Sequence, residues 1–209
     1  MNPNATILQH PLIEHKLAIL RSRDTPNPLF RETLEELSYL IVYEITRDLA
    51  LRPVRIQTPL ASCAAQQLAE QVLLVPVLRA GLGMVGGILH LIPDAKVGHL
   101  GVYRNERTLQ PVEYYCKLPP GAETMRVFLL DPMLATGGSL AYGIARLKEK
   151  GIRQIVVVSI LAAPEGLAAL HAAHPDVKIY AAMLDARLDE RGYILPGLGD
   201  CGDRLFGTL

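Results

Sequence analysis

Short apolar runs alternate with amphipathic stretches over most of the chain, and this alternation limits the fold more than any other feature of the sequence. The apolar runs are predicted strands, since they are rich in Val, Ile and Leu and are bounded by turn-forming residues. They cover residues 71–78, 96–104, 111–119, 126–131, 154–161 and 177–184. Helices are predicted between them at residues 82–92, 139–150 and 164–174. This order indicates an α/β fold with a mostly parallel, doubly wound sheet.

The chain is expected to form one domain over residues 1–209. It is long enough to bury a sizeable core, because 50% of its 209 residues are apolar. Residues 27–51 are predicted as a long helix, with Pro28 in the first turn and apolar residues at helical spacing. The domain then has an N-terminal helical part at about residues 1–51 and a glycine-rich, irregular C-terminal segment at about residues 191–209.

The charge balance excludes two classes of partner. Lys and Arg together number 21, as do Asp and Glu, so no net field attracts nucleic acid or an anionic membrane. The N-terminal stretch "MNPNATILQHPLIEHK" does not resemble a signal peptide, and a cytoplasmic protein is therefore expected. Cys63, Cys116 and Cys201 lie far apart in the chain and are interpreted as reduced thiols.

Residues 72–93 are apolar enough to suggest a membrane span. Arg79 argues against that interpretation, because an arginine in the middle of such a segment costs several kcal/mol in lipid. The same stretch contains two prolines and four glycines. A strand, a turn and a buried helix are therefore predicted instead.

The sequence "DPMLATGGS" at residues 131–139 joins a predicted strand to a predicted helix through small residues. Backbone N–H groups and the helix dipole converge at such a junction, which favours a bound anion. Thr136 and Ser139 add hydroxyl donors, and the two glycines between them let the backbone close around a phosphate. Asp131 suits the hydroxyls of a nearby ribose. The alternative is an ordinary glycine-containing turn with no ligand. Asp131 is then only a carboxylate at the end of the strand.

A second glycine-rich turn, "GLGMVG" at residues 81–86, matches the dinucleotide-binding fingerprint, with Glu106 in place for a ribose. Pro76 interrupts the preceding strand and Arg79 stands just before the glycines, which disfavours this alternative. Arg79 fits better as a guanidinium that binds a second anion. A structural ion pair is the other interpretation of Arg79.

These features together describe one ligand. The loop at residues 131–139 offers a phosphate site, and Asp131 offers a carboxylate for the diol of a ribose. Arg79 and a polar loop that carries Arg104 and Arg107 offer cations for pyrophosphate. Phosphoribosyl pyrophosphate (PRPP) combines all three groups.

Four stretches resemble the type I phosphoribosyltransferases and, with Pro132 after Asp131, the uracil phosphoribosyltransferase family. "DPMLATGGS" resembles the PRPP loop, "VPVLRAGLGM" the pyrophosphate-binding turn, "YRNE" with "YYCKLP" the active-site hairpin, and "YILPGLGDCGDRLFGT" the uracil-binding end. They span Val75 to Thr208 in the family's order. One departure is Cys201, where the family usually has a small residue such as alanine. The resemblance implies a mostly parallel sheet flanked by helices, N-terminal helices, a β-hairpin arm and an irregular base-binding segment.

The resemblance also implies the reaction and its residues. The phosphoribosyl group of PRPP passes to N1 of uracil, giving UMP and pyrophosphate. The implied catalytic residues are Asp131, Arg104 and Asp200. The implied PRPP-binding residues are Arg79, Arg104, Asp131, Pro132, Met133, Leu134, Ala135, Thr136, Gly137, Gly138, Ser139 and Asp200. The implied uracil-binding residues are Ile194, Gly199, Asp200 and Cys201.

Cofactor and partners follow from the same resemblance. Mg²⁺ is expected to bind mainly through PRPP oxygens and water, and GTP is a candidate effector because it activates some members of the family. A homodimer or higher homo-oligomer is expected, since residues 111–119 form an apolar, tyrosine-rich strand. Tyr114 and Tyr115 stay without an assigned role. For Asp203 and Arg204, an ion pair that pins the C-terminal tail is favoured over a direct role in the site.

Overall fold

The computed structural model describes residues 4–104 and 111–208. Within these residues a nine-stranded sheet forms the centre of the fold. Its strands are β1 (Ala5–Ile7), β4 (Val72–Leu78), β5 (Lys96–Val97), β6 (His99–Arg104), β7 (Pro111–Lys117), β8 (Arg126–Leu130), β9 (Met133–Leu134), β10 (Ile155–Ala162) and β11 (Lys178–Leu184). The main path runs β1-β11-β10-β8-β4-β6-β7, with β5 on β4 and β9 on β10. Among the described residues of this sheet, β6 and β7 are the only strands that pair antiparallel, and all other pairs are parallel. The predicted mostly parallel sheet is therefore confirmed.

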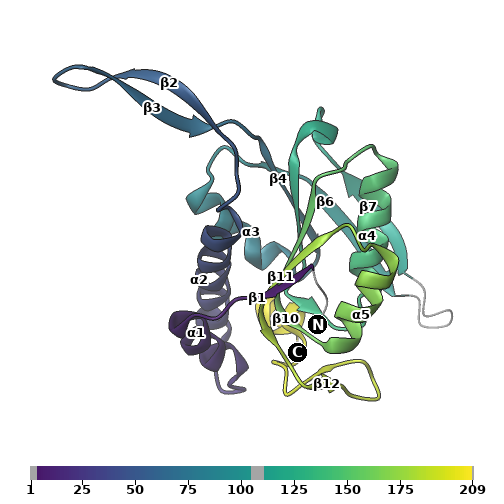
Figure 1. Cartoon of the computed structure of the whole chain (residues 1–209). Coiled ribbons are helices and arrows are strands. Elements are labelled where there is room, and N and C mark those ends of the chain that lie inside the picture. Colours follow the sequence, from purple (N-terminus) through teal and green to yellow (C-terminus); the bar gives the residue numbers. More distant parts are fainter. Residues whose placement is uncertain (1–3, 105–110, 209) are drawn as a thin grey trace.

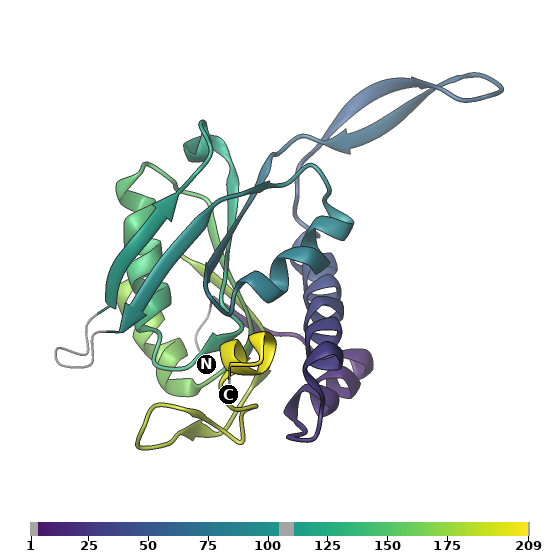
Figure 2. The same ribbon diagram turned by 180° about the vertical axis from the view of Figure 1, so that it is seen from behind.

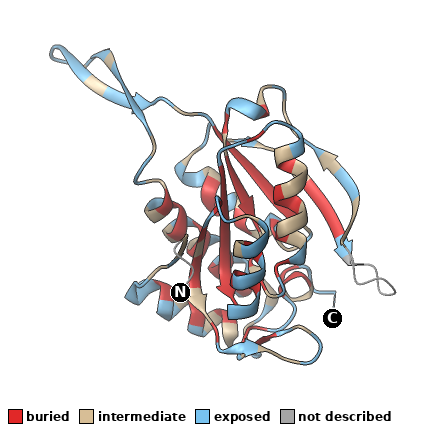
Figure 3. Cartoon of the chain, turned by 45° about the vertical axis from the view of Figure 1, so that its right-hand side comes forward, coloured by how far each residue is buried: buried red, intermediate tan, exposed pale blue. Residues whose placement is uncertain are grey.

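Helices cover both faces of the sheet (Figures 1 and 2). One face carries α1 (Pro11–Arg21), α2 (Asn27–Ile45) and α3 (Leu82–Leu91). The other carries α4 (Gly138–Glu149) and α5 (Pro164–Ala173). Successive side chains of β8 alternate between the two layers: Phe128 and Leu130 join the core under α2, whereas Val127 and Leu129 join the core under α4. A strand buried on both faces explains the continuous apolar run in the sequence (Figure 3).

A two-stranded hairpin projects from the body between α2 and β4 (Figure 1). It consists of β2 (Leu51–Gln57) and β3 (Ser62–Leu68), and its residues are exposed or half-buried. The helix predicted over residues 27–51 is therefore too long, because α2 ends at Ile45 and Leu51 already begins a strand. The resemblance implies a β-hairpin arm, but the residues of β3 do not indicate its position, since "SCAAQQL" contains no β-branched or aromatic residue to signal a strand.

The C-terminal segment is more regular than predicted. β12 (Arg187–Leu188) pairs with β13 (Ile194–Leu195), and a short helix, α6 (Cys201–Phe206), follows. The carboxylate of Asp200 caps α6 by accepting a hydrogen bond from the Asp203 N–H at 2.9 Å. A 3₁₀ turn at Ala122–Thr124 precedes β8.

The stretch considered as a membrane span divides into β4, a turn and α3, as predicted. In residues 4–104 and 111–208, none of the helices combines the length and the apolar character that a bilayer crossing requires.

Candidate active site

The loop after β8 forms a small hollow at the carboxyl edge of the sheet, where parallel α/β sheets usually bind ligands. Asp131 directly follows β8, and α4 begins seven residues later at Gly138. The hollow has a volume of about 100 Å³ and is lined by Asp131, Met133, Ala135, Thr136, Gly137, Gly138, Ser139 and Leu140. The amino end of a twelve-residue helix thus points its free N–H groups at this hollow.

The first part of the loop is anchored to the sheet. The Pro132 carbonyl accepts hydrogen bonds from the N–H groups of Ile160 and Leu161 at 3.1 and 2.9 Å. The Leu134 carbonyl accepts one from Ala163 at 2.9 Å. Pro132 and Leu134 are both buried and do not line the hollow, although both were predicted to bind PRPP. Their contacts hold the rest of the loop in place.

The two glycines of the loop have different structural roles. Gly137 lies at φ +81°, and a Cβ there would also come within 3.0 Å of the Gly166 carbonyl oxygen. Only glycine adopts that backbone conformation readily. At Gly138, in contrast, a Cβ would meet only the Thr136 hydroxyl, at 3.8 Å. The protein itself therefore does not require glycine at residue 138.

Asp131 has an unusual carboxyl group. Its Oδ1 accepts a hydrogen bond from the Met133 N–H at 3.1 Å, which alone would lower the pKa. Although the residue keeps some exposure, desolvation by the surrounding protein is the larger effect and raises the pKa of Asp131 to about 7. A cationic sugar or a metal ion beside this group would favour its ionised form.

Arg79 lies in the turn between β4 and α3 and contacts the C-terminal segment. Its Nη2 donates to Asp203 Oδ1 at 3.0 Å, and its guanidinium lies 5.8 Å from the centre of the Phe206 ring. The side chain is 55% exposed, and an arginine carries five N–H donors. Arg79 thus forms the structural ion pair considered above and retains donors for an anion.

The glycines after Arg79 serve helix packing. A Cβ at Gly81 would lie 2.4 Å from the Leu130 carbonyl oxygen, and one at Gly83 would lie 2.6 Å from a methyl group of Leu34. The "GLGMVG" turn is therefore filled by protein atoms, which disfavours the dinucleotide site. Glu106 and Arg107 lie outside the described residues, and Arg104 is placed only as the last residue of β6.

The four residues predicted to bind uracil lie together in the C-terminal segment. Ile194 is in β13, Gly199 adopts φ +81°, Asp200 caps α6, and Cys201 is the first residue of α6. Cys201 is 3% exposed. Burial raises the pKa of its thiol, and the negative charges of Asp131 and Asp200 add to this effect. The start of α6 lies beside the turn after β4, since a Cβ at Gly202 would be 3.8 Å from Arg79 Nη2.

Asp203 and Arg204 hold this segment by different contacts. Asp203 forms the predicted ion pair, with Arg79, and also accepts a hydrogen bond from the Thr208 hydroxyl at 2.6 Å. Those two donors hold the pKa of Asp203 below its usual value. Arg204 instead donates to the backbone carbonyls of Leu20, Ser22 and Leu198.

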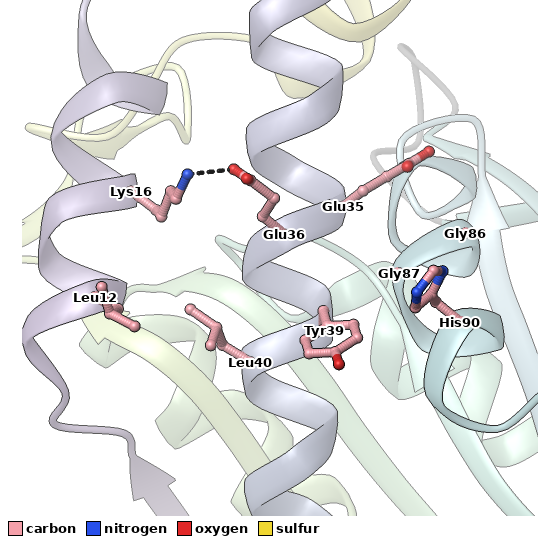
Figure 4. A pocket seen from close by; sticks show the side chains of 9 residues that line it. All are labelled: Leu12, Lys16, Glu35, Glu36, Tyr39, Leu40, Gly86, Gly87 and His90. Carbon is pink, nitrogen blue, oxygen red and sulfur yellow. Dashed lines mark hydrogen bonds and ion pairs between the residues drawn. The ribbon is translucent and has the colours of Figure 1, made fainter.

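A separate hollow of about 410 Å³ lies between α1, α2 and α3 (Figure 4). The charged residues at its rim are Lys16, Glu35 and Glu36, and Lys16 is paired with Glu36. These three side chains give the hollow a net negative charge. None of the predicted site residues lines it. This hollow is thus poorly suited to a ligand with several phosphates.

The chain resembles known proteins over almost its whole length. The sequence model of the uracil phosphoribosyltransferase family matches residues 7–208. A uracil phosphoribosyltransferase from Latilactobacillus sakei is 55% identical over 97% of this chain and 98% of its own. One from Streptococcus pneumoniae serotype 4 is 54% identical over 97% of each chain.

Solved structures agree with the sequence relatives. The AQ2163 protein from Aquifex aeolicus superposes with a TM-score of 0.92 at 41% identity and covers 98% of each chain. An adenine phosphoribosyltransferase from Trypanosoma brucei, at 16% identity, shares the fold with a TM-score of 0.57 over 95% of this chain and 88% of its own. The family model, the sequence relatives and the loop at residues 131–139 lead to one conclusion: this chain belongs to the uracil phosphoribosyltransferase family.

Proposed function

We propose that this protein transfers the 5-phosphoribosyl group of PRPP to N1 of uracil and releases UMP and pyrophosphate. The observation that carries the proposal is the hollow at the start of α4, which joins a single carboxylate, Asp131, to a loop of N–H and hydroxyl donors. The uracil phosphoribosyltransferase relatives support the choice of base. The ion pair between Arg79 and Asp203, which joins the turn after β4 to α6, supports a base site beside the pyrophosphate.

In the proposed complex the loop from Ala135 to Ser139 binds the 5′-phosphate, with the amino end of α4 supplying electrostatic stabilisation. Asp131 binds the ribose hydroxyls. The bond from the anomeric carbon to the pyrophosphate oxygen breaks, a bond to uracil N1 forms, and the N1 proton is released. Since the sugar is cationic at the transition state, the ionised form of Asp131 stabilises it.

The two arginines of the proposed site act on the leaving group. Arg79 and Arg104 bind the pyrophosphate through charge-assisted hydrogen bonds. The same contacts stabilise the charge that develops on pyrophosphate as it departs. No covalent intermediate on the protein is required.

Uracil is proposed to bind to the main chain of Gly199, Asp200 and Cys201, together with Ile194. Uracil presents alternating carbonyl acceptors and N–H donors, which a rigid loop can match. The amino group of cytosine would then face a group that cannot pair with it, so cytosine is rejected.

Mg²⁺ is proposed as the cofactor, carried by the substrate. Magnesium usually keeps several waters and binds to one or two carboxylates and to substrate phosphates. The described part of the chain offers no group of three or more His, Cys, Asp or Glu side chains for a metal, whereas Asp131 lies where the ribose is proposed to bind. The donor set thus fits an ion held mainly by PRPP oxygens and water, which would neutralise diphosphate charge.

A homodimer is proposed as the functional unit. Two-stranded hairpins are marginally stable alone, yet β2 and β3 stand away from the body and expose Leu51 at 58%, and the turn between them exposes Leu60 at 96%. Tyr114 and Tyr115 on β7 are exposed at 55% and 45%. A second copy of the chain would cover these apolar side chains. GTP is a proposed effector, and initial rates with and without GTP test it.

The experiment that tests the proposed function is an assay of pyrophosphate release with a panel of bases. We expect PRPP-dependent turnover with uracil and little with cytosine, hypoxanthine, guanine or orotate. Comparable specific activity with any of these other bases would overturn the proposed substrate. Formation of PRPP from UMP and pyrophosphate tests the reverse reaction.

A further inference from the structure

A largely buried ion pair holds the backbone of the segment proposed to bind uracil. Arg21 is the last residue of α1, and Asp185 directly follows β11. Nη2 of Arg21 donates to Oδ1 of Asp185 at 2.5 Å, and Nη1 donates to Oδ2 at 2.9 Å. The Asp185 side chain is only 4% exposed. This bidentate geometry fixes both the position and the plane of each group.

The ion pair binds both polar backbone groups of Gly197. The Gly197 N–H donates to Asp185 Oδ2, and the Gly197 carbonyl accepts from Arg21 Nη1, each at 2.9 Å. The residue lies at φ +62°, and a Cβ there would be 2.1 Å from the Ile194 carbonyl oxygen. Gly197 stands between Ile194 and Gly199, so the two side chains orient the turn that joins the proposed base-binding residues.

Arg204 continues this arrangement at the next residue. Its Nη1 donates to the carbonyls of Leu198 and Leu20, at 2.8 and 2.5 Å, and its Nη2 donates to the Ser22 carbonyl at 2.6 Å. Leu20 and Ser22 flank Arg21 at the end of α1. Two consecutive residues of the turn are thus tied to the same helix end.

Stability alone is a poor explanation for this pair, because buried ion pairs often stabilise a protein no more than apolar side chains of the same size. Orientation explains it better. A site that reads a base through main-chain groups needs those groups held within about half an ångström of the productive geometry. Gly197 belongs to no strand or helix that would fix its orientation. The charged side chains of Arg21 and Asp185 hold its backbone in one orientation instead.

We propose that Arg21 and Asp185 are positioning residues for uracil: they fix the turn at Gly197 so that the main chain of residues 199–201 meets the edge of the base. The inference rests on the proposed role of residues 194–201 in binding uracil. Neither residue belongs to a motif that the sequence analysis singled out. The one signal for Asp185 is its place directly after a predicted strand, at the ligand-binding edge of the sheet.

The test is the steady-state kinetics of Arg21→Lys, Arg21→Met and Asp185→Asn with both substrates. Lysine keeps the charge but cannot contact both the carboxylate and the Gly197 carbonyl as the planar fork does. We expect KM for uracil to rise roughly tenfold or more, since hydrogen bonds to charged groups are lost at the turn. KM for PRPP should stay within about twofold of wild type, and the preference for uracil over cytosine should fall.

Arg126→Met is the matched control. Arg126 is 15% exposed, binds Asp48 and Glu70, and lies at the first residue of β8, at the opposite edge of the sheet. Its loss should lower the melting temperature without changing KM for uracil. Gly199→Ala serves as a direct test of the base-binding segment and should raise KM for uracil.

The outcomes separate the inference from the proposed site. If Arg21→Lys and Asp185→Asn lower only the melting temperature, as Arg126→Met does, while Gly199→Ala raises KM for uracil, the ion pair is merely structural and the inference is overturned. If Gly199→Ala also leaves KM for uracil unchanged, the segment does not bind the base, and both proposals fail. A selective rise in KM for uracil in the folded Arg21 and Asp185 variants supports the inference.

Discussion

Arg79 and Asp203 form an ion pair of 3.0 Å that joins the turn after β4 to α6. The turn carries the arginine proposed to bind pyrophosphate, and α6 begins with residues proposed to bind uracil. The pair therefore links the two proposed substrate sites. It is partly exposed, so its contribution to stability is small.

We expect Arg79→Ala to lower activity far more than stability. The variant loses charge-assisted contacts with pyrophosphate, which are worth roughly 1.5–3 kcal/mol, or about ten- to a hundredfold in kcat/KM for PRPP. Kinetics and thermal unfolding measure the two effects. Arg47→Ala is the control, because Arg47 is also exposed and paired, with Glu44 of α2 at 2.7 Å. A folded Arg79→Ala protein with wild-type kinetics would show that Arg79 has only the structural role.

We expect Gly138→Ala to fold like wild type and to bind PRPP weakly. The added Cβ meets only the Thr136 hydroxyl within the protein, but it would occupy the space proposed for the 5′-phosphate. Calorimetric titration with PRPP and a melting curve provide the measurements. Gly137→Ala should behave differently and lose stability, since alanine at φ +81° is strained. Unchanged PRPP affinity in Gly138→Ala would contradict the phosphate site.

Asp131→Asn should change the pH dependence of both stability and activity. The pKa of Asp131 is about 7 in the folded protein, whereas the ordinary pKa of an aspartic acid, which applies to the unfolded chain, is 3.8. The native state therefore holds the proton more tightly, so the contribution of this group to stability is complete below pH 3.8 and is lost as the pH rises through about 7.

The melting temperature of Asp131→Asn relative to wild type should thus increase from pH 5 to pH 8, roughly following the titration of this one carboxyl group. The kcat/KM of the wild type for PRPP should rise with pH, with an acid limb centred near pH 7, because the ionised carboxylate is the active form. The variant should lack that limb and lose mainly kcat. A difference in melting temperature that does not vary with pH would contradict the raised pKa.

Cys63 and Cys201 should differ in reactivity toward a thiol reagent. Cys63 is exposed on β3 in the single chain and should react more rapidly than Cys201. Burial raises the pKa of the Cys201 thiol, which keeps it protonated and unreactive in the native protein. Cys201→Ala should cost roughly 1 kcal/mol of stability for the small cavity and preserve the preference for uracil. Rapid labelling of Cys201 in the folded protein would show that α6 opens.

The proposed homodimer predicts a dimer mass in light scattering at micromolar concentration. Replacing Leu60 by Ser at the tip of the β2–β3 hairpin should weaken the dimer without lowering the stability of the body, because this side chain is 96% exposed in the single chain. A monomer at all concentrations would contradict the proposal.

The centre of the sheet could be predicted because β4, β8 and β10 are buried on both faces and therefore appear as continuous apolar runs. The strand predicted at 126–131 is Arg126–Leu130, and the helix predicted at 139–150 is Gly138–Glu149. The projecting hairpin and α1 could not be predicted in this way. Residues 62–68 form a strand because they pair with β2, and little in their own composition favours one.

The sequence by itself determined the loop at residues 131–139, with its carboxylate, hydroxyls and glycines, since that chemistry lies within one short stretch. Only the tertiary structure decided the partners that orient the site. Arg79 and Asp203 are 124 residues apart, and Arg21 and Asp185 are 164 residues apart. Local propensities and side-chain spacings act over one or two turns of chain, so these pairs exist only because the packing of the helices and the sheet brings their elements together.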